Sequence, residues 1–291
     1  MSDNGSLFTM YTLTPLHAGA GDTAGAIDLP VQREKHTEYP AVFSSAMKGS
    51  LRCFFECSKR YETANINAIF GTEGNDQRDS VSGKVVFTDA KILLFPVRSS
   101  EGVFKWITCP FVIERIRRDL QFIGISKEVE AISSTAFRTP AYTDKVILED
   151  FPVSVSNVPV SSSALFEFLK HLTVSHFFPE EILKQRLIIV SDDIFKTLVT
   201  TATQIIARNV LDNDTKKSNN LWYEEVVPAD AVFYTIMKPA YRESNDVMST
   251  LNNGIAGQIL QVGGNETIGY GFVKMSNNIA PTLKSTGGQN G

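Results

Sequence analysis

Apolar and polar side chains alternate along residues 7–14, and this period of two predicts a β-strand that ends at Pro15. The next segment, residues 16–42, is glycine-containing and predicts a long loop, a kind of segment that is usually functional or disordered. Residues 44–59 show a helical period, with apolar side chains on one face at Met47, Leu51, Phe54 and Phe55. We expect Ser44 or Ser45 to be the N-cap of this helix.

The rest of the chain mixes strand-like and helix-like segments without a regular alternation. Predicted strands cover residues 84–90, 91–97, 104–108, 145–151, 186–190, 207–211, 221–227 and 232–237. Predicted helices cover residues 110–122, 163–176, 192–206 and 246–260, whereas residues 61–80 are polar and rich in turn formers. The polar residues 212–220 join two of the strands into a long hairpin. This order predicts an α+β fold, and because we find no repeat or linker, we expect one elaborated domain over residues 1–291.

Composition and charge narrow the class of protein. The chain has 291 residues, of which 43% are hydrophobic and 21% charged, and it shows no membrane-spanning run and no signal peptide. Cys53, Cys57 and Cys109 lack metal-ligand spacing, so we expect buried reduced thiols in a cytoplasmic protein. The net charge of −4 argues against a protein that coats nucleic acid by itself, although 28 Lys and Arg residues suffice for a local basic groove.

The segment Ser44-Ser45-x-x-Lys48-Gly49-x-x-Arg52 combines a helix start with two cations. Free N–H groups and the positive dipole end make a helix N-terminus a site for anions. Lys48 and Arg52 lie four residues apart and therefore share a helix face, where they could follow successive phosphates. A capped helix with a solvated basic face explains the same pattern, so both interpretations stay open.

A second glycine-rich segment lies near the end of the chain, at residues 262–273. Its glycines let backbone N–H groups approach a ligand, and the four of them are Gly263, Gly264, Gly269 and Gly271. The segment lacks the Gly-Lys-Ser/Thr ending of a P-loop. A tight turn between two strands is the alternative interpretation.

His17 and Asp28 are the two groups with chemical potential in the long loop. Cleavage of RNA by the adjacent 2′-hydroxyl needs a base, an acid and charge stabilisation. Histidine suits proton transfer, and aspartate can act as a base or hold a divalent cation. Asp28 stands in the otherwise apolar string Ala26-Ile27-Asp28-Leu29-Pro30, where a charge is unexpected. The structural alternative is that Asp28 caps a turn and His17 packs on the loop.

The predicted hairpin carries Lys216 and Lys217 in its polar tip and the sequence Leu221-Trp222-Tyr223-Glu224-Glu225 on its second strand. Aromatic side chains such as Trp222 and lysines on a projecting ribbon suit base stacking and contact with an RNA backbone. Because a strand alternates faces, only one of Glu224 and Glu225 can join a given site. An edge ribbon with solubilising charges is the alternative.

The order of these segments resembles the RAMP superfamily of CRISPR-associated proteins. The resemblance rests on TPLHAGAG at residues 14–21, GAIDLPVQRE at residues 25–34, the Ser-Ser-x-x-Lys-Gly-x-x-Arg segment and GGNETIGYG at residues 263–271, with FTDA, LLFPVRS and WYEEVVP between them. It spans about Leu7 to Met275. Within the superfamily, the chain looks most like the repeated backbone subunit of type III-B (Cmr) effector complexes.

This resemblance implies an RRM-like (ferredoxin-like) palm at about residues 7–60 and 81–275, with an inserted β-hairpin thumb near residues 207–228 and a tail at residues 276–291. It also implies a filament of several copies along a guide CRISPR RNA, together with other effector subunits. Each copy would cut the complementary single-stranded target RNA beside the thumb, with a divalent cation, magnesium or manganese, that is not tightly bound.

The resemblance also assigns residues by position. Asp28 matches the family's catalytic loop aspartate and candidate metal ligand, and His17 matches the loop histidine before it. A thumb-base glutamate is implied as well, for which we favour Glu225 over Glu224. The positions that match guide-backbone contacts are Ser44, Ser45, Lys48, Arg52 and the loop with Gly263, Gly264, Gly269 and Gly271. Tyr270 stands where many members carry a basic residue, which puts one phosphate contact in doubt.

Two other functions remain open at this point. In the first, the chain is a non-catalytic scaffold that binds the guide, and Asp28 is structural. In the second, the chain is an endoribonuclease that processes repeat RNA into guides.

Overall fold

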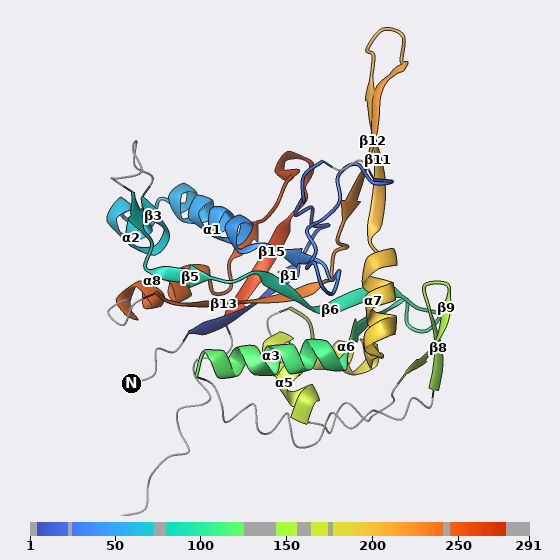
Figure 1. The fold of residues 1–291 in the computed structure, drawn as a ribbon, viewed down its shortest axis with the longest axis horizontal. Helices are drawn as coiled ribbons and strands as arrows, with labels where there is room; N and C mark the ends of the chain where they lie inside the picture. The colour runs from blue at the N-terminus through green and yellow to red at the C-terminus, as the bar shows by residue number, and fades with distance from the viewer. Residues whose placement is uncertain are drawn as a thin grey trace, which may run out of the picture.

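The computed structural model describes residues 5–22, 25–72, 80–124, 144–155, 164–173, 177–240 and 245–277. A mixed sheet in the order β10-β7-β6-β13-β1-β15-β14 forms its centre, with β2 beside β6 and β5 beside β13 (Figure 1). Its strands are β1 (Ser6–Thr12), β2 (Ala41–Val42), β5 (Val85–Phe87), β6 (Ala90–Arg98), β7 (Phe104–Thr108), β10 (Leu187–Ile189), β13 (Val232–Pro239), β14 (Ile259–Gln261) and β15 (Phe272–Asn277). Helices and strands around a mixed sheet agree with the predicted class.

Strand β1 lies in the middle of this sheet and pairs antiparallel with β13 and with β15. The chain passes from β1 through α1 (Ser44–Ser58) to β6, and from β13 through α8 (Asn245–Ile255) to β15. Each helix therefore connects two strands that have a third strand between them. Because both faces of the sheet are covered, successive residues 7–10 of β1 are all buried despite their alternating polarity.

Helices cover both faces of the sheet (Figure 1). On one face lie α3 (Pro110–Phe122) and α5 (Ala164–Thr173), and Thr9 of β1 donates a hydrogen bond to the Leu172 carbonyl at 3.0 Å. On the other face lie α1 and α2 (Thr63–Phe70), with Met47, Leu51 and Phe55 of α1 fully buried. Two further helices, α6 (Glu180–Arg186) and α7 (Asp192–Thr201), lead toward the base of a long ribbon. In the described ranges, no helix is long and apolar enough to cross a membrane.

The ribbon consists of β11 (Gln204–Leu211) and β12 (Ser218–Val226) and projects away from the rest of the protein (Figure 1). Most of its side chains are exposed, whereas Glu224, Glu225 and Val226 at its base are buried. The predicted hairpin is confirmed, but it is longer than expected, because residues 204–206 belong to β11 and not to the preceding helix. Two smaller ribbons are β3 (Gly71–Thr72) with β4 (Val81–Ser82), and β8 (Asp144–Leu148) with β9 (Phe151–Val155).

Several predicted elements differ from the observed ones. Helices α2 and α6 were not predicted, and the predicted strand at residues 145–151 is wrong because a turn with Glu149 at φ 53° divides it into β8 and β9. The predicted helix at residues 246–260 ends at Ile255, before Gly257 at φ 75° turns the chain into β14. Residues 133–143 and 156–162, the two ends of the predicted helix at 163 and 174–176, and the predicted tail from residue 278 lie outside the described residues.

The start of α1 is capped by distant residues. Phe43 occupies the N-cap position with an extended backbone and no side-chain cap, so the prediction of a serine cap is wrong. Instead, the Asp89 carboxylate accepts a hydrogen bond from the Ser44 backbone N–H at 2.7 Å, and the Gln32 side chain accepts one from the Phe43 N–H at 2.7 Å. A carboxylate therefore already occupies this end of the helix dipole.

The three cysteines are free thiols, but only Cys109 is buried as expected. Burial raises the pKa of the Cys109 thiol to about 12. Cys53 and Cys57 are exposed, with their Sγ atoms 3.8 Å apart, because they lie off the apolar face of α1 that packs on the sheet. The expectation of buried thiols is therefore wrong for these two residues.

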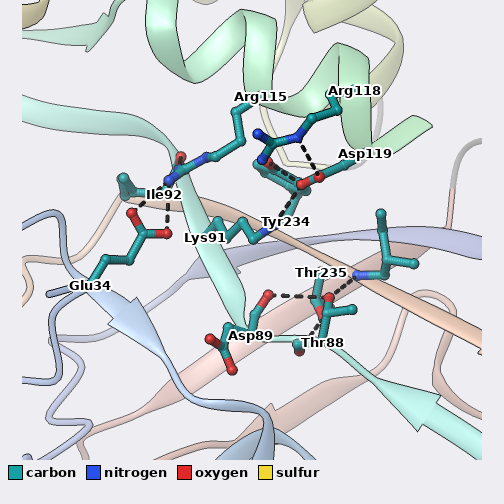
Figure 2. A network of polar contacts seen from close by, with 11 residues as sticks. Glu34, Thr88, Asp89, Lys91, Ile92, Arg115, Arg118, Asp119, Tyr234 and Thr235 are labelled. Atoms are coloured by element: carbon teal, nitrogen blue, oxygen red, sulfur yellow. Dashed lines mark hydrogen bonds and ion pairs between the residues drawn. The ribbon is translucent and has the colours of Figure 1, made fainter. Parts of the chain in front are cut away.

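A buried polar network ties the long loop to the sheet (Figure 2). Arg115 of α3 is 4% exposed and donates to both carboxylate oxygens of Glu34 at 2.7 Å and to the Ile92 carbonyl at 3.2 Å. One turn later, Asp119 accepts hydrogen bonds from the Tyr234 hydroxyl at 2.9 Å and from Lys91 at 2.7 Å. Burial raises the pKa of Tyr234, which keeps its hydroxyl a neutral donor. The network holds Glu34, and with it the part of the long loop around this residue, in place.

Replacement of Arg115 by methionine should leave Glu34 as an uncompensated, largely buried charge. We expect the free energy of unfolding to fall by about 3–5 kcal/mol, as measured by urea titration. Arg118→Gln on the same helix is the control. Its side chain is 67% exposed and lies 3.7 Å from Asp119, so the loss should stay below about 1 kcal/mol. Equal losses for both variants would contradict the special role of the buried pair.

Candidate active site

The long loop returns along the outer edge of β12, at the base of the ribbon. Leu29 N donates to the Tyr223 carbonyl at 3.1 Å, and Glu225 N donates to the Leu29 carbonyl at 3.0 Å, so the loop runs parallel to the strand here. The Asp28 side chain extends this pairing, because its Oδ2 accepts a hydrogen bond from the Tyr223 N–H at 2.7 Å. Asp28 therefore caps an edge N–H of β12 while its side chain stays exposed.

Glu225 fixes this loop from the inside. Its carboxylate is buried, and Oε2 accepts a hydrogen bond from Val31 N at 3.0 Å. Oε1 accepts hydrogen bonds from the Thr203 hydroxyl at 2.6 Å and from the Arg33 guanidinium. Arg33 also donates to the Val199 carbonyl at the end of α7, at 3.1 Å. Loop, ribbon and helix α7 are thus joined at one carboxylate.

His17 lies against the neighbouring glutamate. Its Nδ1 is 2.8 Å from the Glu225 carbonyl oxygen, and since a carbonyl only accepts, Nδ1 carries the hydrogen and Nε2 is the acceptor of the neutral ring. The same Nδ1 is 3.5 Å from Glu224 Oε1. Neighbouring side chains on a strand point to opposite faces, so the Glu224 carboxylate and not that of Glu225 accompanies His17.

Two more side chains hold the Glu224 carboxylate, which is only 3% exposed. Arg208 of β11 donates from Nε to Glu224 Oε2 at 3.0 Å, and the Asn265 side-chain amide donates to Oε1. Burial lowers the pKa of Arg208, but the hydrogen bond to Glu224 and the nearby Tyr270 outweigh it, and the pKa is raised overall. Glu224 and Arg208 therefore form a charged, largely buried pair.

The glycine-rich segment forms the turn from β14 to β15, with a 3-10 helix, η2 (Glu266–Ile268), inside it. This turn packs on His17, because the Gly264 N–H donates to the His17 carbonyl at 2.9 Å. Gly263 has φ 82°, and a Cβ there would lie 2.3 Å from that carbonyl oxygen, so glycine is required. The turn interpretation is therefore correct for the backbone, while Gly269, with open space around it, leaves room for a ligand.

Three of the predicted guide contacts line one pocket of about 450 Å³ between α1 and the β3–β4 ribbon, namely Ser45, Lys48 and Arg52. Gly71 and Gly83 contribute backbone to the same pocket. Arg52 forms an ion pair with Glu56 at 2.8 Å and donates to the Gly71 carbonyl at 3.4 Å. Ser44 lies at the capped start of α1, so its backbone N–H is already engaged by a carboxylate.

The remaining predicted residues lie farther out on the ribbon. Lys216 and Lys217 are exposed at its tip, in a turn whose N–H groups bond to Asp212. Trp222 is half-buried and pairs in register with Arg208. The structure therefore brings His17, Asp28 and the glutamates together at the ribbon base and keeps the pocket and the tip separate.

Sequence reasoning did not identify four residues of the ribbon base. Arg33 and Thr203 hold Glu225, whereas Arg208 and Asn265 hold Glu224. For Arg208, the signal was present in the chain, since pairing the two predicted strands would have placed this arginine across from Trp222. For the other three, the contacts depend on how the loops dock, which no local pattern reports.

The donors at this site suit a cation that a substrate helps to hold. Across the described residues, no three His, Cys, Asp or Glu side chains converge as a metal site. Glu224 and Glu225 are paired with Arg208 and Arg33, which leaves the exposed Asp28 as the available carboxylate. Magnesium is commonly held by one or two carboxylates together with substrate phosphates, so Asp28 fits such a shared site.

Comparisons with known proteins identify the family of the chain. The family model described as the RAMP superfamily matches residues 9–274. The chain belongs to the RAMP superfamily. This RAMP protein is 36% identical over 282 residues to the CRISPR system Cmr endoribonuclease Cmr4 of Pyrococcus furiosus, with 93% of the chain and 94% of the relative covered.

Two solved structures resemble this RAMP protein over most of its length. The crystal structure of oligomeric Cmr4 from Pyrococcus furiosus matches with a TM-score of 0.75 and 30% identity, covering 94% of the chain and 98% of that structure's chain. A cryo-EM structure of type III-B Cmr-beta bound to cognate target RNA matches with a TM-score of 0.75 and 19% identity, covering 94% and 96%. The second match shows the shared fold. The predicted family resemblance is confirmed.

Proposed function

We propose that this protein is the repeated subunit of a type III-B CRISPR effector, in which several copies line up on a guide RNA beside other effector subunits. Each copy cuts the complementary single-stranded target RNA. The observation that carries this proposal is the meeting of His17, Glu224 and Asp28 at the ribbon base. The identity to a named endoribonuclease and the likeness to an oligomeric crystal structure support it.

We propose that the sheet core is an RRM-like palm and that the β11–β12 ribbon is the thumb. The order β6-β13-β1-β15, with α1 and α8 as crossovers, is the split βαβ arrangement of ferredoxin-like folds. The thumb then emerges beside the edge that carries Asp28. A target strand that passes the thumb base would meet both His17 and Asp28.

In the proposed reaction, His17 Nε2 takes the proton of a target 2′-hydroxyl, whose oxygen attacks the adjacent phosphorus. The bond from phosphorus to the 5′-oxygen breaks, and this oxygen takes a proton from water, which leaves a 2′,3′-cyclic phosphate and a 5′-hydroxyl. His17 then returns its proton to the solvent. The Nδ1–H group keeps donating its hydrogen bond to the Glu225 carbonyl, which keeps the ring oriented. The Glu224 carboxylate, 3.5 Å from Nδ1, stabilises the imidazolium that forms.

Glu224 is therefore our choice for the thumb-base glutamate of the site. Its side chain accompanies His17, whereas the Glu225 carboxylate is engaged by Val31, Arg33 and Thr203. Glu225 contributes to the site through its backbone carbonyl and through the loop that it holds. The preference for Glu225 from the sequence is revised in this proposal.

Asp28 is the proposed protein ligand for a divalent cation, magnesium or manganese, shared with RNA phosphate oxygens. When bound, the cation would supply Lewis-acid stabilisation of the reacting phosphate. The Tyr223 N–H fixes Oδ2 of Asp28, so the carboxylate is held at the strand edge without a cationic partner from the site's arginines. We propose the pocket at Ser45, Lys48 and Arg52 and the turn at residues 263–271 as contacts for the guide.

Asp28→Asn and His17→Ala should each slow cleavage by about 10²–10⁴-fold, because each removes a group that acts on the reacting atoms. Cleavage of a guide-complementary RNA by the assembled complex is measured under single-turnover conditions. Guide loading and target binding should be unchanged. Asp22→Asn, an exposed acid in the same loop, is the matched control and should cut normally.

Undiminished cleavage by both variants would identify the chain as a scaffold and refute the catalytic assignment. Incubation of the purified protein with repeat RNA in the absence of a guide tests the processing alternative, and specific cutting there would favour it.

Removal of divalent cations by EDTA should stop cleavage by the wild-type complex, and added magnesium or manganese should restore it. Target binding, measured by gel shift, should persist under EDTA. Full cleavage in excess EDTA would contradict the proposed cation and leave the assignment of His17 intact.

Lys48→Gln and Arg52→Gln should weaken guide binding and flatten its dependence on salt. The slope of log K against log salt should fall by about one unit or less for each lost phosphate contact. Fluorescence anisotropy with labelled guide RNA across a salt series measures both quantities. Lys59→Gln, an exposed lysine at the end of the same helix, is the control, and an equal effect there would contradict a specific contact.

A further inference from the structure

One face of the ribbon carries Arg208, Trp222 and Glu224 together. The register pairs Arg208 with Trp222 and Ile206 with Glu224, and residues that pair directly across a ribbon share a face. The Arg208 side chain reaches diagonally to Glu224, at 3.0 Å. At the ribbon base, this face meets His17 through Glu224, so an aromatic ring, a guanidinium and an imidazole follow one another along it.

Arg208 has a donor that the protein does not use. Its Nε bonds to Glu224, but within the described chain its Nη2 has no hydrogen-bond partner, although that atom is buried. The guanidinium lies over the Tyr270 ring, 5.1 Å from the centroid, and the side chain is 26% exposed. A shielded N–H without a partner is unfavourable, and a bound ligand that accepts from it would relieve this. The guanidinium is therefore held in place, and its Nη2 is the donor without an acceptor in the described part of the chain.

A phosphate at this site also needs a positive charge that offsets the carboxylates nearby. A phosphate that approaches His17 meets the carboxylates of Glu224 and Asp28, and it needs a cation beside it. Arg33 is the other arginine of the ribbon base, and it donates to Glu38, Val199 and Glu225. Arg208 is therefore the arginine of this site that has a buried nitrogen without a hydrogen-bond partner among the described residues.

We infer that Arg208 is a further catalytic residue, which donates a hydrogen bond to a non-bridging oxygen of the phosphate that is cut. This inference rests on the proposed cleavage. Negative charge grows on that oxygen as the 2′-oxygen bonds to phosphorus and the 5′-oxygen leaves. A guanidinium already fixed by Glu224 and Tyr270 stabilises this charge once the bound RNA uncovers Nη2, which the protein buries in the free chain. Arg208 keeps all its protons, and the 2′-hydroxyl proton goes to His17.

A purely structural Arg208 would only neutralise Glu224. The two roles differ in what they predict for the phosphate oxygens. A direct contact distinguishes the two non-bridging oxygens, because one of them accepts the hydrogen bond. If Arg208 is only structural, its replacement leaves the preference between the two oxygens unchanged, because that preference then comes from the cation proposed at Asp28.

The test uses target RNAs with a single Rp or Sp phosphorothioate at the cut position, cleaved by the assembled complex under single-turnover conditions. The wild type should cut one diastereomer more slowly than the other. Arg208→Gln should cut unmodified RNA about 10²–10³-fold more slowly and should change the size of this preference, to which the cation proposed at Asp28 also contributes. Arg208→Lys, which keeps the charge but not the fork, should fall between the two. Guide loading and circular dichroism check that each variant is folded and assembled.

Arg33→Gln is the matched control, because Arg33 also pairs with a buried glutamate at the ribbon base. It should keep the diastereomer preference of the wild type even where its rate is lower. A wild type without any preference, or an Arg208→Gln complex that keeps it unchanged, would overturn the assignment of Arg208. If the wild type does not cut RNA at all, the proposed function fails instead. If the wild type cuts and the His17→Ala variant does not, the proposed function holds. The phosphorothioate result with Arg208→Gln then tests the role of Arg208 alone.

Discussion

The buried carboxylate of Glu225 is the contact on which the arrangement of the site depends. It accepts hydrogen bonds from Val31 of the loop, from Arg33 and from Thr203 at the foot of the ribbon. A buried carboxylate is tolerated only when it is paired and fully bonded, so these elements cannot separate without exposing an uncompensated charge. This explains how a long, glycine-containing loop stays docked on the edge of β12. Once the loop is docked there, Asp28 reaches the Tyr223 N–H.

The two consecutive glutamates have different roles, because their side chains lie on opposite faces of β12. Glu225 anchors the loop, and Glu224 turns to the opposite face, where Arg208, Asn265 and His17 surround it. The turn after β14 belongs to the same unit, because Gly264 bonds to the His17 carbonyl while Asn265 bonds to Glu224. A segment that we expect to hold the guide therefore also holds the histidine that we expect to act on the target. If both expectations hold, guide loading and site geometry share one set of contacts.

Patterns with a local cause could be predicted from the sequence, and contacts with a distant cause could not. The apolar periods of β1, α1 and α3 and the polar tip of the ribbon lie within single segments, and these elements appear close to their predicted bounds. The cap of α1 is Asp89, 45 residues from Ser44, so the nearby serines were misleading. Strand alternation showed that only one glutamate could face the site. Which glutamate faces the site depends on where the loop docks on β12. The sequence of a single segment does not determine this.

The acidic balance of the chain illustrates the same difference between composition and arrangement. Glu34, Glu224, Glu225 and Asp119 are each bonded to an arginine or a lysine inside the protein, so their charges are largely cancelled where they stand. Several cations lie at places where RNA is expected to bind. Lys48 lines the pocket along α1, and Lys216 and Lys217 are exposed at the ribbon tip. A chain with a net charge of −4 can therefore present a local cationic path to RNA, because its acids are used to build the site that the path leads to.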